Sequence, residues 1–433
     1  MRIKYERNRE VLLDFCNLNY SISSFKKLIY NNFKKDDKFA VCLLDISNFK
    51  FYNYRFGYEY GDAVLTIVFY KVQQAIRDIG KVYRFGGNTL LILLKDIISE
   101  SEVENIIKDI LKIFDYPIDI GKEQIRISTN IGIAIHPRDS TNIEAILKYA
   151  EIALTYSKKC HNDKYKFFEQ TMHHETIERG KVEEELINAI YSNEFILYYQ
   201  PQVDINTMKV FGMEALLRWR HPKKGILTPS YFIDIVEQNG MINEIGKFVF
   251  HRACKELKKW HKSGFGNLCM SINVSETQFG DTSFLSFIDE VLEKTQVEAK
   301  YINVEITERI LINPSKNMLN ILSALRSKGM KILIDDFGTK YSSLNYLYCF
   351  PIDGIKIDKS FIDRIESSEK ELIITKNIIK LAHELNIEII AEGVEQKEQL
   401  QVLKKINCEK IQGFIFGKPV AADEFINLLN KFK

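Results

Sequence analysis

The sequence lacks several features that mark particular classes of protein. It has no apolar run of the roughly 18 residues that a membrane span needs, and no apolar stretch follows its charged N-terminus as in a signal peptide. Its 7 cysteines form no C-x-x-C pair, which argues against a zinc site or a disulfide framework and favours reduced thiols. With 60 basic and 58 acidic residues, the net charge of +2 gives no reason to expect a nucleic-acid polymer or a membrane surface as partner. We therefore expect a cytoplasmic protein.

The rest of the composition is that of a folded globular chain. Hydrophobic residues make up 45% of the 433 positions, while glycine and proline number only 21 and 8. This balance excludes a disordered or linker-dominated chain. At roughly 150 residues per domain, the length leaves room for two or three domains.

Strands and helices alternate over 38–169, after a short N-terminal segment at 1–37. The order β-α-β-β-α-β predicts an α+β ferredoxin-like domain whose antiparallel sheet is open on one face. Strands are expected at 39–47, 81–94 (two short strands around Gly86-Gly87), 125–137 and 165–169, and helices at 61–79, 101–114 and 143–159.

The pattern changes after 170–185, where charged residues predict a connecting helix. Eight strand-like apolar runs, most of them separated by helical stretches, occupy 186–433. This is the size and pattern of a (β/α)₈ TIM-like barrel, so the fold class is α/β. The runs cover 195–204, 210–219, 267–275, 302–308, 330–336, 353–358, 387–394 and 410–417.

Polar residues lie near the C-terminal end of these runs or just past it. In a barrel, those ends converge on the face that carries active sites. An isolated acid at a strand end is usually a solvated rim residue or a helix cap, but several acids brought together raise one another's pKa unless a cation holds them ionised. Oxygen ligands without His or Cys favour Mg²⁺, Mn²⁺ or Ca²⁺ over zinc. The residues are Glu214, Asn273, Glu305, Glu308, Asp335, Asp336, Lys356, Glu392 and Gln412.

The adjacent acids Asp335 and Asp336 favour a two-metal site, in which one carboxylate bridges two ions about 4 Å apart. Such a site activates water and neutralises phosphate, and Lys356 adds a fixed positive charge beside the nucleophile or the phosphate. These residues by themselves predict a metal-assisted phosphoester hydrolase, and they leave its substrate open.

The motifs around these residues resemble those of the EAL phosphodiesterases of cyclic di-GMP. From about Gly180 to the C-terminus, the motifs GMEALLRW, SINVS, VEITE, IDDFGTKYSSL, IKID, AEGVE and QGF follow in the family's order and spacing. The resemblance implies two Mg²⁺ or Mn²⁺ ions and in-line hydrolysis of one phosphodiester to give linear pGpG. It implies the metal ligands Glu214, Asn273, Glu305, Asp335, Asp336 and Glu392, with Asp335 bridging the two ions.

The same resemblance implies further roles. We expect Lys356 and Glu392 to hold and deprotonate the attacking water, and Glu214 and Asp336 to act with them in catalysis. Arg218 and Gln412 are expected to contact the dinucleotide. Glu308 is expected to anchor the loop after Asp336. The family's barrels often pair around the fifth and sixth strands, which implies a homodimer. One departure is Lys340, which replaces a glycine of the family pattern. It removes backbone freedom from its loop, so we expect it to affect regulation or turnover rather than metal ligation.

The N-terminal domain resembles a GGDEF (diguanylate cyclase) domain through LLDISNFKFYNYRFGYEYGDAVL. The signature turn reads Gly86-Gly87-Asn88-Thr89, so two acids of the family pattern are replaced by side chains without the negative charge that holds Mg²⁺. We therefore expect a degenerate domain without cyclase activity, which could bind GTP and regulate the barrel. The resemblance implies Asp45 as the metal aspartate, Asn53 and Asp62 as guanine contacts, and Lys158 as a phosphate contact.

Three functions from different classes follow. An active cyclic di-GMP phosphodiesterase is favoured by the full ligand set. A non-catalytic cyclic di-GMP receptor would be expected had Glu214, Asp335 or Lys356 been lost. A diguanylate cyclase or bifunctional enzyme is disfavoured by Asn88 and Thr89.

Overall fold

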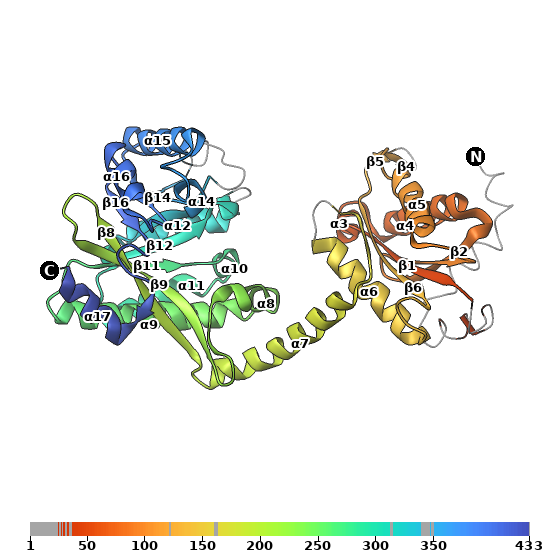
Figure 1. The fold of residues 1–433 in the computed structure, drawn as a ribbon, viewed down its shortest axis with the longest axis horizontal. Helices are drawn as coiled ribbons and strands as arrows, with labels where there is room; N and C mark the ends of the chain where they lie inside the picture. The colour runs from red at the N-terminus through yellow and green to blue at the C-terminus, as the bar shows by residue number, and fades with distance from the viewer. Residues whose placement is uncertain are drawn as a thin grey trace. The chain divides into compact units, whose positions relative to one another are not determined.

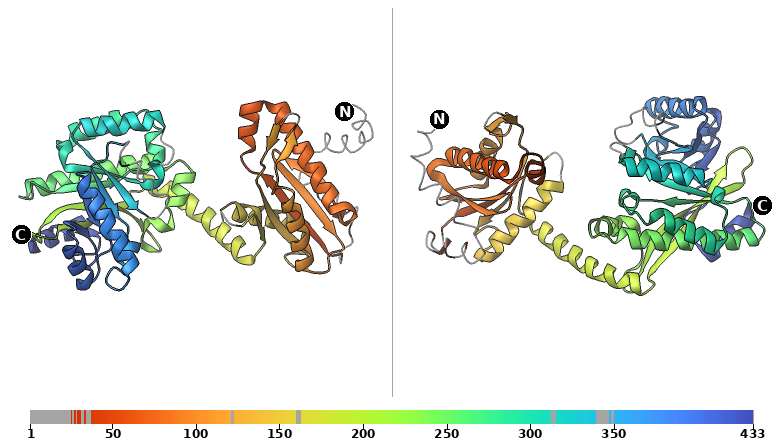
Figure 2. Two further views of the ribbon diagram at one scale, coloured as in Figure 1. Left: turned by 90° about the horizontal axis from the view of Figure 1, so that it is seen from above. Right: turned by 180° about the vertical axis from the view of Figure 1, so that it is seen from behind.

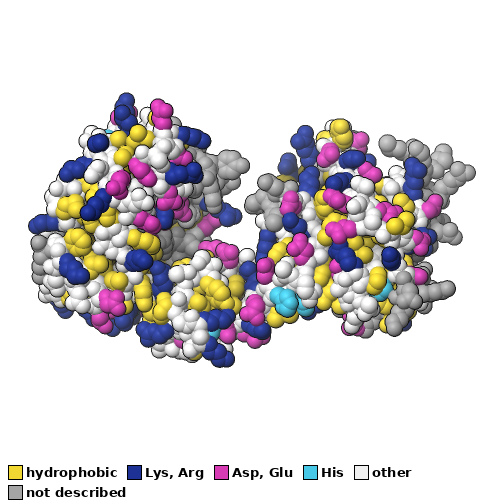
Figure 3. All heavy atoms as spheres, in the orientation of Figure 1, with side chains coloured by type: hydrophobic (Ala, Val, Ile, Leu, Met, Phe, Trp, Pro, Cys, Tyr) yellow, Lys and Arg dark blue, Asp and Glu magenta, His cyan; other side chains and the backbone are white. Residues whose placement is uncertain are grey.

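The computed structural model describes residues 25, 27, 29, 30, 33, 37–120, 123–159, 163–311, 315–338, 347 and 350–432. The chain divides into two compact units, Met1–Lys181 and Val182–Lys433, and each is described by itself (Figure 1). Among the described residues, no helix combines the length and the apolar character that crossing a bilayer requires. Basic and acidic side chains are interspersed over the face shown in Figure 3, in keeping with the near-zero net charge.

The first unit is built on a five-stranded sheet in the order β2-β3-β1-β6-β7. The order β6-β1-β3-β2, antiparallel throughout, is the ferredoxin-like arrangement that the sequence predicts, and β7 extends it parallel to β6. The strands are β1 (Phe39–Ile46), β2 (Gly80–Gly86), β3 (Thr89–Lys95), β6 (Thr129–His136) and β7 (Tyr165–Phe167), and the main helices are α4 (Tyr58–Ile76), α5 (Glu100–Lys112) and α6 (Ile143–Lys159).

The prediction that one face of this sheet is open is wrong. Every residue of β1 is buried, and alternate residues enter two cores: Cys42 and Leu44 join the core of α4 and α5, while Val41 and Leu43 join that of α6. The third helix covers the face that a two-helix ferredoxin-like fold leaves exposed. Two further elements were not predicted, the short helix α3 (Phe49–Phe56) and the hairpin of β4 (Ile118–Ile120) and β5 (Glu123–Ile125).

The second unit is a closed eight-stranded barrel, as predicted. Its strand order is β8-β9-β11-β12-β13-β14-β15-β16, and β16 pairs with β8 to close it. The first strand differs from a fully parallel barrel, because β8 runs antiparallel to both of its neighbours. A short hairpin connection joins β8 to β9, whereas parallel strands need a long crossover. The strands are β8 (Phe195–Asp204), β9 (Val210–His221), β11 (Cys269–Asn273), β12 (Ile302–Thr307), β13 (Lys331–Phe337), β14 (Gly354–Ile357), β15 (Glu388–Ala391) and β16 (Lys410–Gln412).

Helices surround the barrel strands and bury an apolar layer between them (Figure 2). Helix α7 (Gln170–Tyr191) covers the expected connecting helix and continues to Tyr191, where Leu186 and Ala189 pack into the barrel unit's core. The other helices are α8 (Ile233–Gln238), α9 (Ile242–Lys262), α10 (Glu276–Phe279), α11 (Phe284–Thr295), α12 (Lys316–Ser327), α14 (Lys359–Ile362), α15 (Glu369–Glu384), α16 (Lys397–Lys405) and α17 (Ala422–Lys431), and the short strands are β10 (Gly225–Leu227) and β17 (Val420–Ala421).

A glycine on β6 allows α6 to approach the sheet. A Cβ at Gly132 would lie 2.1 Å from the Leu154 backbone nitrogen and 2.2 Å from the Ala150 carbonyl oxygen. We expect Gly132→Ala to lower the free energy of unfolding of the first unit by about 1–3 kcal/mol, because backbone must move to make room.

Circular dichroism during urea unfolding measures this loss, while the fluorescence of Trp219 and Trp260 follows the barrel unit alone. The matched control is Gly180→Ala on α7, where a Cβ meets nothing within 4 Å and should stabilise by about 0.5–1 kcal/mol. Equal unfolding curves for Gly132→Ala and the wild type would contradict the packing argument.

Candidate metal centre and active site in the barrel

Four carboxylates surround the ammonium group of Lys356 inside the mouth of the barrel. Its Nζ lies 3.2 Å from Glu214 Oε2, 2.9 Å from Glu305 Oε2, 3.1 Å from Asp335 Oδ1 and 2.6 Å from Glu392 Oε1. These residues come from β9, β12, β13, β14 and the segment directly after β15. The structure thus brings together acids that are far apart in the sequence.

Strand alternation places these side chains in the barrel interior. On β12, Val304 and Ile306 belong to the apolar layer between strands and helices, so Glu305 between them faces the opposite side. Lys356 likewise lies between two buried isoleucines of that layer on β14. Both Glu305 and Lys356 have 0% exposure.

Glu214 is not at the end of its strand, where the sequence analysis put it. Strand β9 continues to His221 because it forms a long hairpin with β8. Glu214 instead lies near the end of the shorter stretch, Gly212–Ala215, that also pairs with β11. It reaches the barrel mouth because β9 leaves the closed barrel beyond this stretch.

Two amides donate hydrogen bonds to Glu214. Asn273 Nδ2 donates to Oε1 at 2.7 Å, and Gln412 Nε2 donates to Oε2 at 2.6 Å. Burial alone would raise the pKa of Glu214, but the positive charge of Lys356 and these hydrogen bonds lower it below its usual range. Glu214 is therefore held as a carboxylate.

The other acids carry more negative charge than one lysine can balance. Burial, with the like charges of Asp335 and Glu214, raises the pKa of Glu392 to about 8 against the opposing effect of Lys356. Burial and the neighbouring Asp335 raise the pKa of Asp336 to about 6. The pKa of Glu305 is raised well above its usual range, mainly by burial. A site of this kind favours additional cations.

A β-bulge lets two adjacent acids serve this site. The pairing of β13 with β14 shifts register between Ile334 and Phe337, and Asp336 has a φ of 53°. In a regular strand, adjacent side chains point to opposite faces, whereas a bulge re-aims one of them. Aspartate is among the few residues that tolerate this left-handed conformation.

The acids fit a pair of hard divalent cations. Oxygens of Glu214, Glu305 and Asp335 lie within 4.8 Å of one another, and so do those of Asp335, Asp336 and Glu392. Asp335 belongs to both groups, as a bridging ligand would. Among the described residues, the buried Glu305 Oε1 receives no hydrogen bond, so it offers a free acceptor. All of these ligand atoms are oxygens, which suits Mg²⁺ or Mn²⁺.

Three further residues named from the sequence lie outside this group of acids or outside the described residues. Glu308 Oε2 accepts a hydrogen bond from the Gly338 backbone nitrogen at 3.1 Å, which ties down the start of the segment after Asp336. Lys340 lies outside the described residues. Arg218 lies further along β9, where its guanidinium donates to the Leu217 carbonyl and lies 5.6 Å from the Tyr198 ring centre.

Two cavities open beside the acids. One, of about 220 Å³, reaches Glu392 and Gln412 and is also lined by Gln200, Lys359 and Phe414. Sequence reasoning missed these last three, although Lys359 closely follows the IKID motif and Phe414 lies within the QGF motif.

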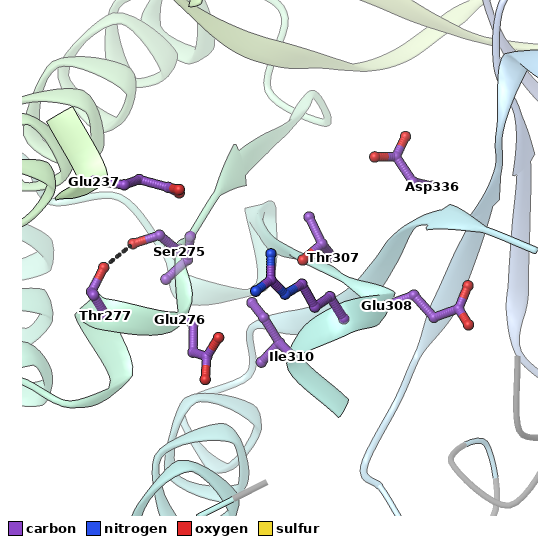
Figure 4. Close-up of a pocket in the computed structure, with 10 residues that line it drawn as sticks. Glu237, Ser275, Glu276, Thr277, Thr307, Glu308, Ile310 and Asp336 are labelled. Atoms are coloured by element: carbon purple, nitrogen blue, oxygen red, sulfur yellow. Dashed lines mark hydrogen bonds between the residues drawn. The ribbon is translucent and has the colours of Figure 1, made fainter. Parts of the chain in front are cut away.

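The other cavity, of about 340 Å³, lies between Glu237 and Asp336, which face it from opposite sides (Figure 4). Ser275, Thr307 and Arg309 also line it. Sequence reasoning missed these residues as well. Arg309 directly follows Glu308, but Glu237 comes from α8, and no motif marks it.

The candidate site of the first unit has a different charge balance. Asp45 Oδ2 lies 2.8 Å from Lys158 Nζ, and its Oδ1 accepts a hydrogen bond from Thr89 at 3.3 Å. Asn88 Nδ2 donates to the Ile46 carbonyl at 2.7 Å. Among the described residues, both acidic clusters with ligand spacing lie in the barrel. The residues around Asp45 therefore do not fit a two-metal site.

The guanine contacts expected in this unit lie on α3 and α4. The side chain of Asp62 is 63% exposed and lies 3.5 Å from Arg84. Asn53 Oδ1 is buried and accepts no hydrogen bond from the described residues, and a Cβ at Gly61 would lie 1.9 Å from it. Asn53 Oδ1 thus lies in the space that a side chain at position 61 would fill.

We expect cation binding to the barrel to strengthen as pH rises. Below pH 8 a proton occupies Glu392, whose pKa is raised to about 8, and the cation must displace it. Each displaced proton weakens binding by up to about tenfold per pH unit. The Mg²⁺ affinity is measured at pH 6, 7 and 8 by titrating Mg²⁺ and recording the unfolding temperature at each concentration. In Glu392→Gln, the Mg²⁺ affinity should depend less on pH. A wild-type Mg²⁺ affinity that does not change with pH would contradict the prediction.

Comparisons with known proteins agree with this geometry. The family model of the EAL domain matches residues 183–419, and that of the diguanylate cyclase GGDEF domain matches residues 11–164. Signaling protein YkoW of Bacillus subtilis is 34% identical over 415 residues, which cover 96% of this chain and 52% of YkoW. Cyclic di-GMP phosphodiesterase NbdA of Pseudomonas aeruginosa is 34% identical over 390 residues, which cover 89% of this chain and 50% of NbdA.

The chain thus spans about half the length of these curated relatives. A solved structure of the PaMucR phosphodiesterase in complex with c-di-GMP superposes with a TM-score of 0.54 at 34% identity, over 56% of this chain and 98% of that one. The chain therefore belongs to the EAL domain family, and a GGDEF-family domain precedes its EAL domain.

Proposed function

We propose that the barrel hydrolyses cyclic di-GMP to linear pGpG. The observation that carries this proposal is the convergence of four carboxylates on Lys356 at the barrel mouth, with Asp335 shared between two ligand groups. The names of relatives such as NbdA and the ligand of the PaMucR structure support the choice of substrate. In the reaction, water adds to one phosphorus, the bond to the 3′-oxygen breaks, and the product keeps a 5′-phosphate.

The residues proposed to hold two divalent cations are Glu214, Asn273, Glu305, Asp335, Asp336 and Glu392. When bound, the cations lower the pKa of water and neutralise the phosphate in the transition state. Asn273 and Gln412 hold Glu214 in its ligand orientation through their hydrogen bonds. Glu308 steadies the segment that follows the bulge.

Lys356 and Glu392 are proposed to handle the attacking water. Glu392 accepts the water's proton, and its raised pKa suits a general base near neutral pH. Lys356, whose pKa is raised well above its usual range by the surrounding acids, stays charged and orients the nucleophile. Because Lys356 is fully buried, its Nζ cannot leave this position.

The dinucleotide is proposed to enter over the cavity that Gln200 and Phe414 line. Lys359 in this lining offers a positive charge to a phosphate, and Phe414, which is 48% exposed, offers a ring face to a base. Gln412 lines the same cavity, and Arg218 lies on β9, the strand that carries Glu214; we propose that both contact the substrate. We also propose that the barrel forms a homodimer around its fifth and sixth strands. Part of the segment that follows the fifth strand, β13, lies outside the described residues.

We expect Glu214→Ala to lower kcat/KM for cyclic di-GMP by about a thousandfold. The reason is that loss of a cation ligand removes roughly 4 kcal/mol of transition-state stabilisation. Chromatography of the nucleotides after incubation with Mg²⁺ or Mn²⁺ measures pGpG directly. Glu409→Gln is a matched control, since Glu409 pairs with His383 away from the acids.

The same assay tests the alternatives. Binding of cyclic di-GMP by the wild type without pGpG formation would contradict the phosphodiesterase and favour a non-catalytic receptor. Cyclic di-GMP formed from GTP would contradict the proposal that the first unit lacks cyclase activity.

For the first unit, we propose a GTP-binding regulatory role without catalysis. Asp45 is neutralised by Lys158, which removes the charge that a cyclase's metal needs. Asp62, whose side chain is 63% exposed, offers carboxylate oxygens to a guanine base, and Asn53 would have to expose its buried Oδ1 to take part. Binding would then depend on base recognition rather than on Mg²⁺.

We expect GTP to bind the full chain even when EDTA removes divalent cations. Asp62→Ala should weaken this binding by about tenfold, because it removes a charged hydrogen bond. Calorimetry measures the affinity, and rates of cyclic di-GMP hydrolysis with and without GTP measure the regulation. Asp163→Ala, which removes an exposed acid paired with Lys166, serves as a control. No binding at millimolar GTP would end this proposal.

A further inference from the structure

The interior of the barrel below the acids is polar. Gln202 on β8, Ser271 on β11 and Asn303 on β12 have exposures of 0%, 0% and 3%. A TIM barrel normally fills such layers with branched apolar side chains. Among described residues, Gln202 Oε1 and Asn303 Oδ1 receive no hydrogen bond, which is destabilising in a buried place. Packing therefore gives no reason for a glutamine at position 202.

Besides its bond to the adjacent strand β16, Gln202 reaches a residue two strands away in the barrel. Its Nε2 lies 3.5 Å from Ser271 Oγ, although β9 stands between β8 and β11. On β9, Gly212 is the residue paired with Gln202. A Cβ at Gly212 would lie only 3.2 Å from Gln202 Oε1 and 2.9 Å from the Cys269 carbonyl oxygen. The missing side chain at Gly212 leaves the space through which Gln202 reaches inward.

Gln202 also fixes the orientation of Gln412. Gln202 Nε2 donates to Gln412 Oε1 at 2.9 Å. Gln412 Nε2 then donates its two hydrogens to Gln200 Oε1 at 3.1 Å and to Glu214 Oε2 at 2.6 Å. If the Gln412 amide turned over, its carbonyl oxygen would face the Glu214 carboxylate, and its NH₂ group would face the donor of Gln202. The bond from Gln202 therefore selects the orientation in which Gln412 supports Glu214.

We propose that Gln202 is a positioning residue for the metal centre and acts through Gln412 on Glu214. This inference rests on the proposed function, because it assigns Glu214 to a metal ligand set. Gln202 has 0% exposure and is separated from the carboxylate by Gln412, so it acts without touching cation or dinucleotide. Partners that orient a metal ligand commonly account for about 10–100-fold in metal affinity.

The test measures Mg²⁺ binding without substrate. We expect Gln202→Met, which keeps the length of the side chain but removes the donor, to raise the apparent dissociation constant for Mg²⁺ about tenfold. The readout is the Mg²⁺ concentration that gives half of the maximal shift in unfolding temperature.

A double-mutant cycle separates positioning from a general packing effect. If Gln202 acts through Gln412, then adding Gln202→Met to Gln412→Met should change the Mg²⁺ affinity no further. Effects of the two substitutions that multiply would overturn the inference, and so would an unchanged Mg²⁺ affinity in Gln202→Met.

The matched control is Gln399→Met. Gln399 is also buried in the same unit, but it bonds the Ile362 carbonyl and the Glu395 and Gln396 backbone nitrogens rather than the side chain of a proposed metal ligand or of Gln412. The substitution Gln399→Met should lower the unfolding temperature of the metal-free protein without changing its Mg²⁺ affinity. Should Gln202→Met fail to fold, Ser271→Ala removes the other contact of the Gln202 amide and should weaken Mg²⁺ binding by a smaller factor.

Failure of this inference can be told apart from failure of the proposed function. If Mg²⁺ does not stabilise the wild type at all, the proposed metal centre is wrong, and the inference falls with it. If Mg²⁺ stabilises the wild type and Gln202→Met equally, only the role of Gln202 is wrong.

Discussion

The buried ammonium group of Lys356 is the interaction on which the functional half of the molecule depends. Burying an ion costs roughly several kcal/mol of desolvation free energy, and only a close opposite charge offsets that cost. Lys356 supplies that charge to four carboxylates at once, within 3.2 Å of each. One positive charge does not balance four acids: burial, with the like charges of Asp335 and Glu214, raises the pKa of Glu392 to about 8 in spite of Lys356. One cation of the chain thus holds the acids together, and their remaining negative charge is what the proposed divalent cations would balance.

The barrel separates stability from chemistry by the two faces of its strands. Outward residues such as Val304 and Ile306 form the apolar layer with the helices, and that layer is continuous around the barrel unit. Inward residues are free to be polar because the fold does not rely on them for its main core. A buried amide network can then extend from Gln202 through Gln412 to Glu214, below the residues that meet the solvent.

The first unit has a charged group, Asp45, without a cluster of acids around it among the described residues. Asn88 and Thr89 turn inward to the Ile46 carbonyl and to Asp45, and Lys158 neutralises Asp45. The strands and the tight turn at Gly86-Gly87 persist, because they depend on backbone geometry and on the cores of α4, α5 and α6. The fold of this sheet is therefore separable from the charge at its turn: the strands and the turn form with Asn88 and Thr89 in place of two acids of the family pattern.

The sequence by itself determined the two-unit α/β organisation and which residues carry charge at the barrel mouth. Apolar runs and motif order are local properties of the chain, so the strands and the acids Glu214, Glu305, Asp335 and Glu392 could be named in advance. Only tertiary structure decided that β8 runs antiparallel, that α6 covers the second face of the first sheet, and that a bulge turns Asp336 toward the site. It also decided which partners a buried side chain finds: the contact of Gln202 with Ser271 needs strand closure and the empty space at Gly212, and no sequence pattern reports either.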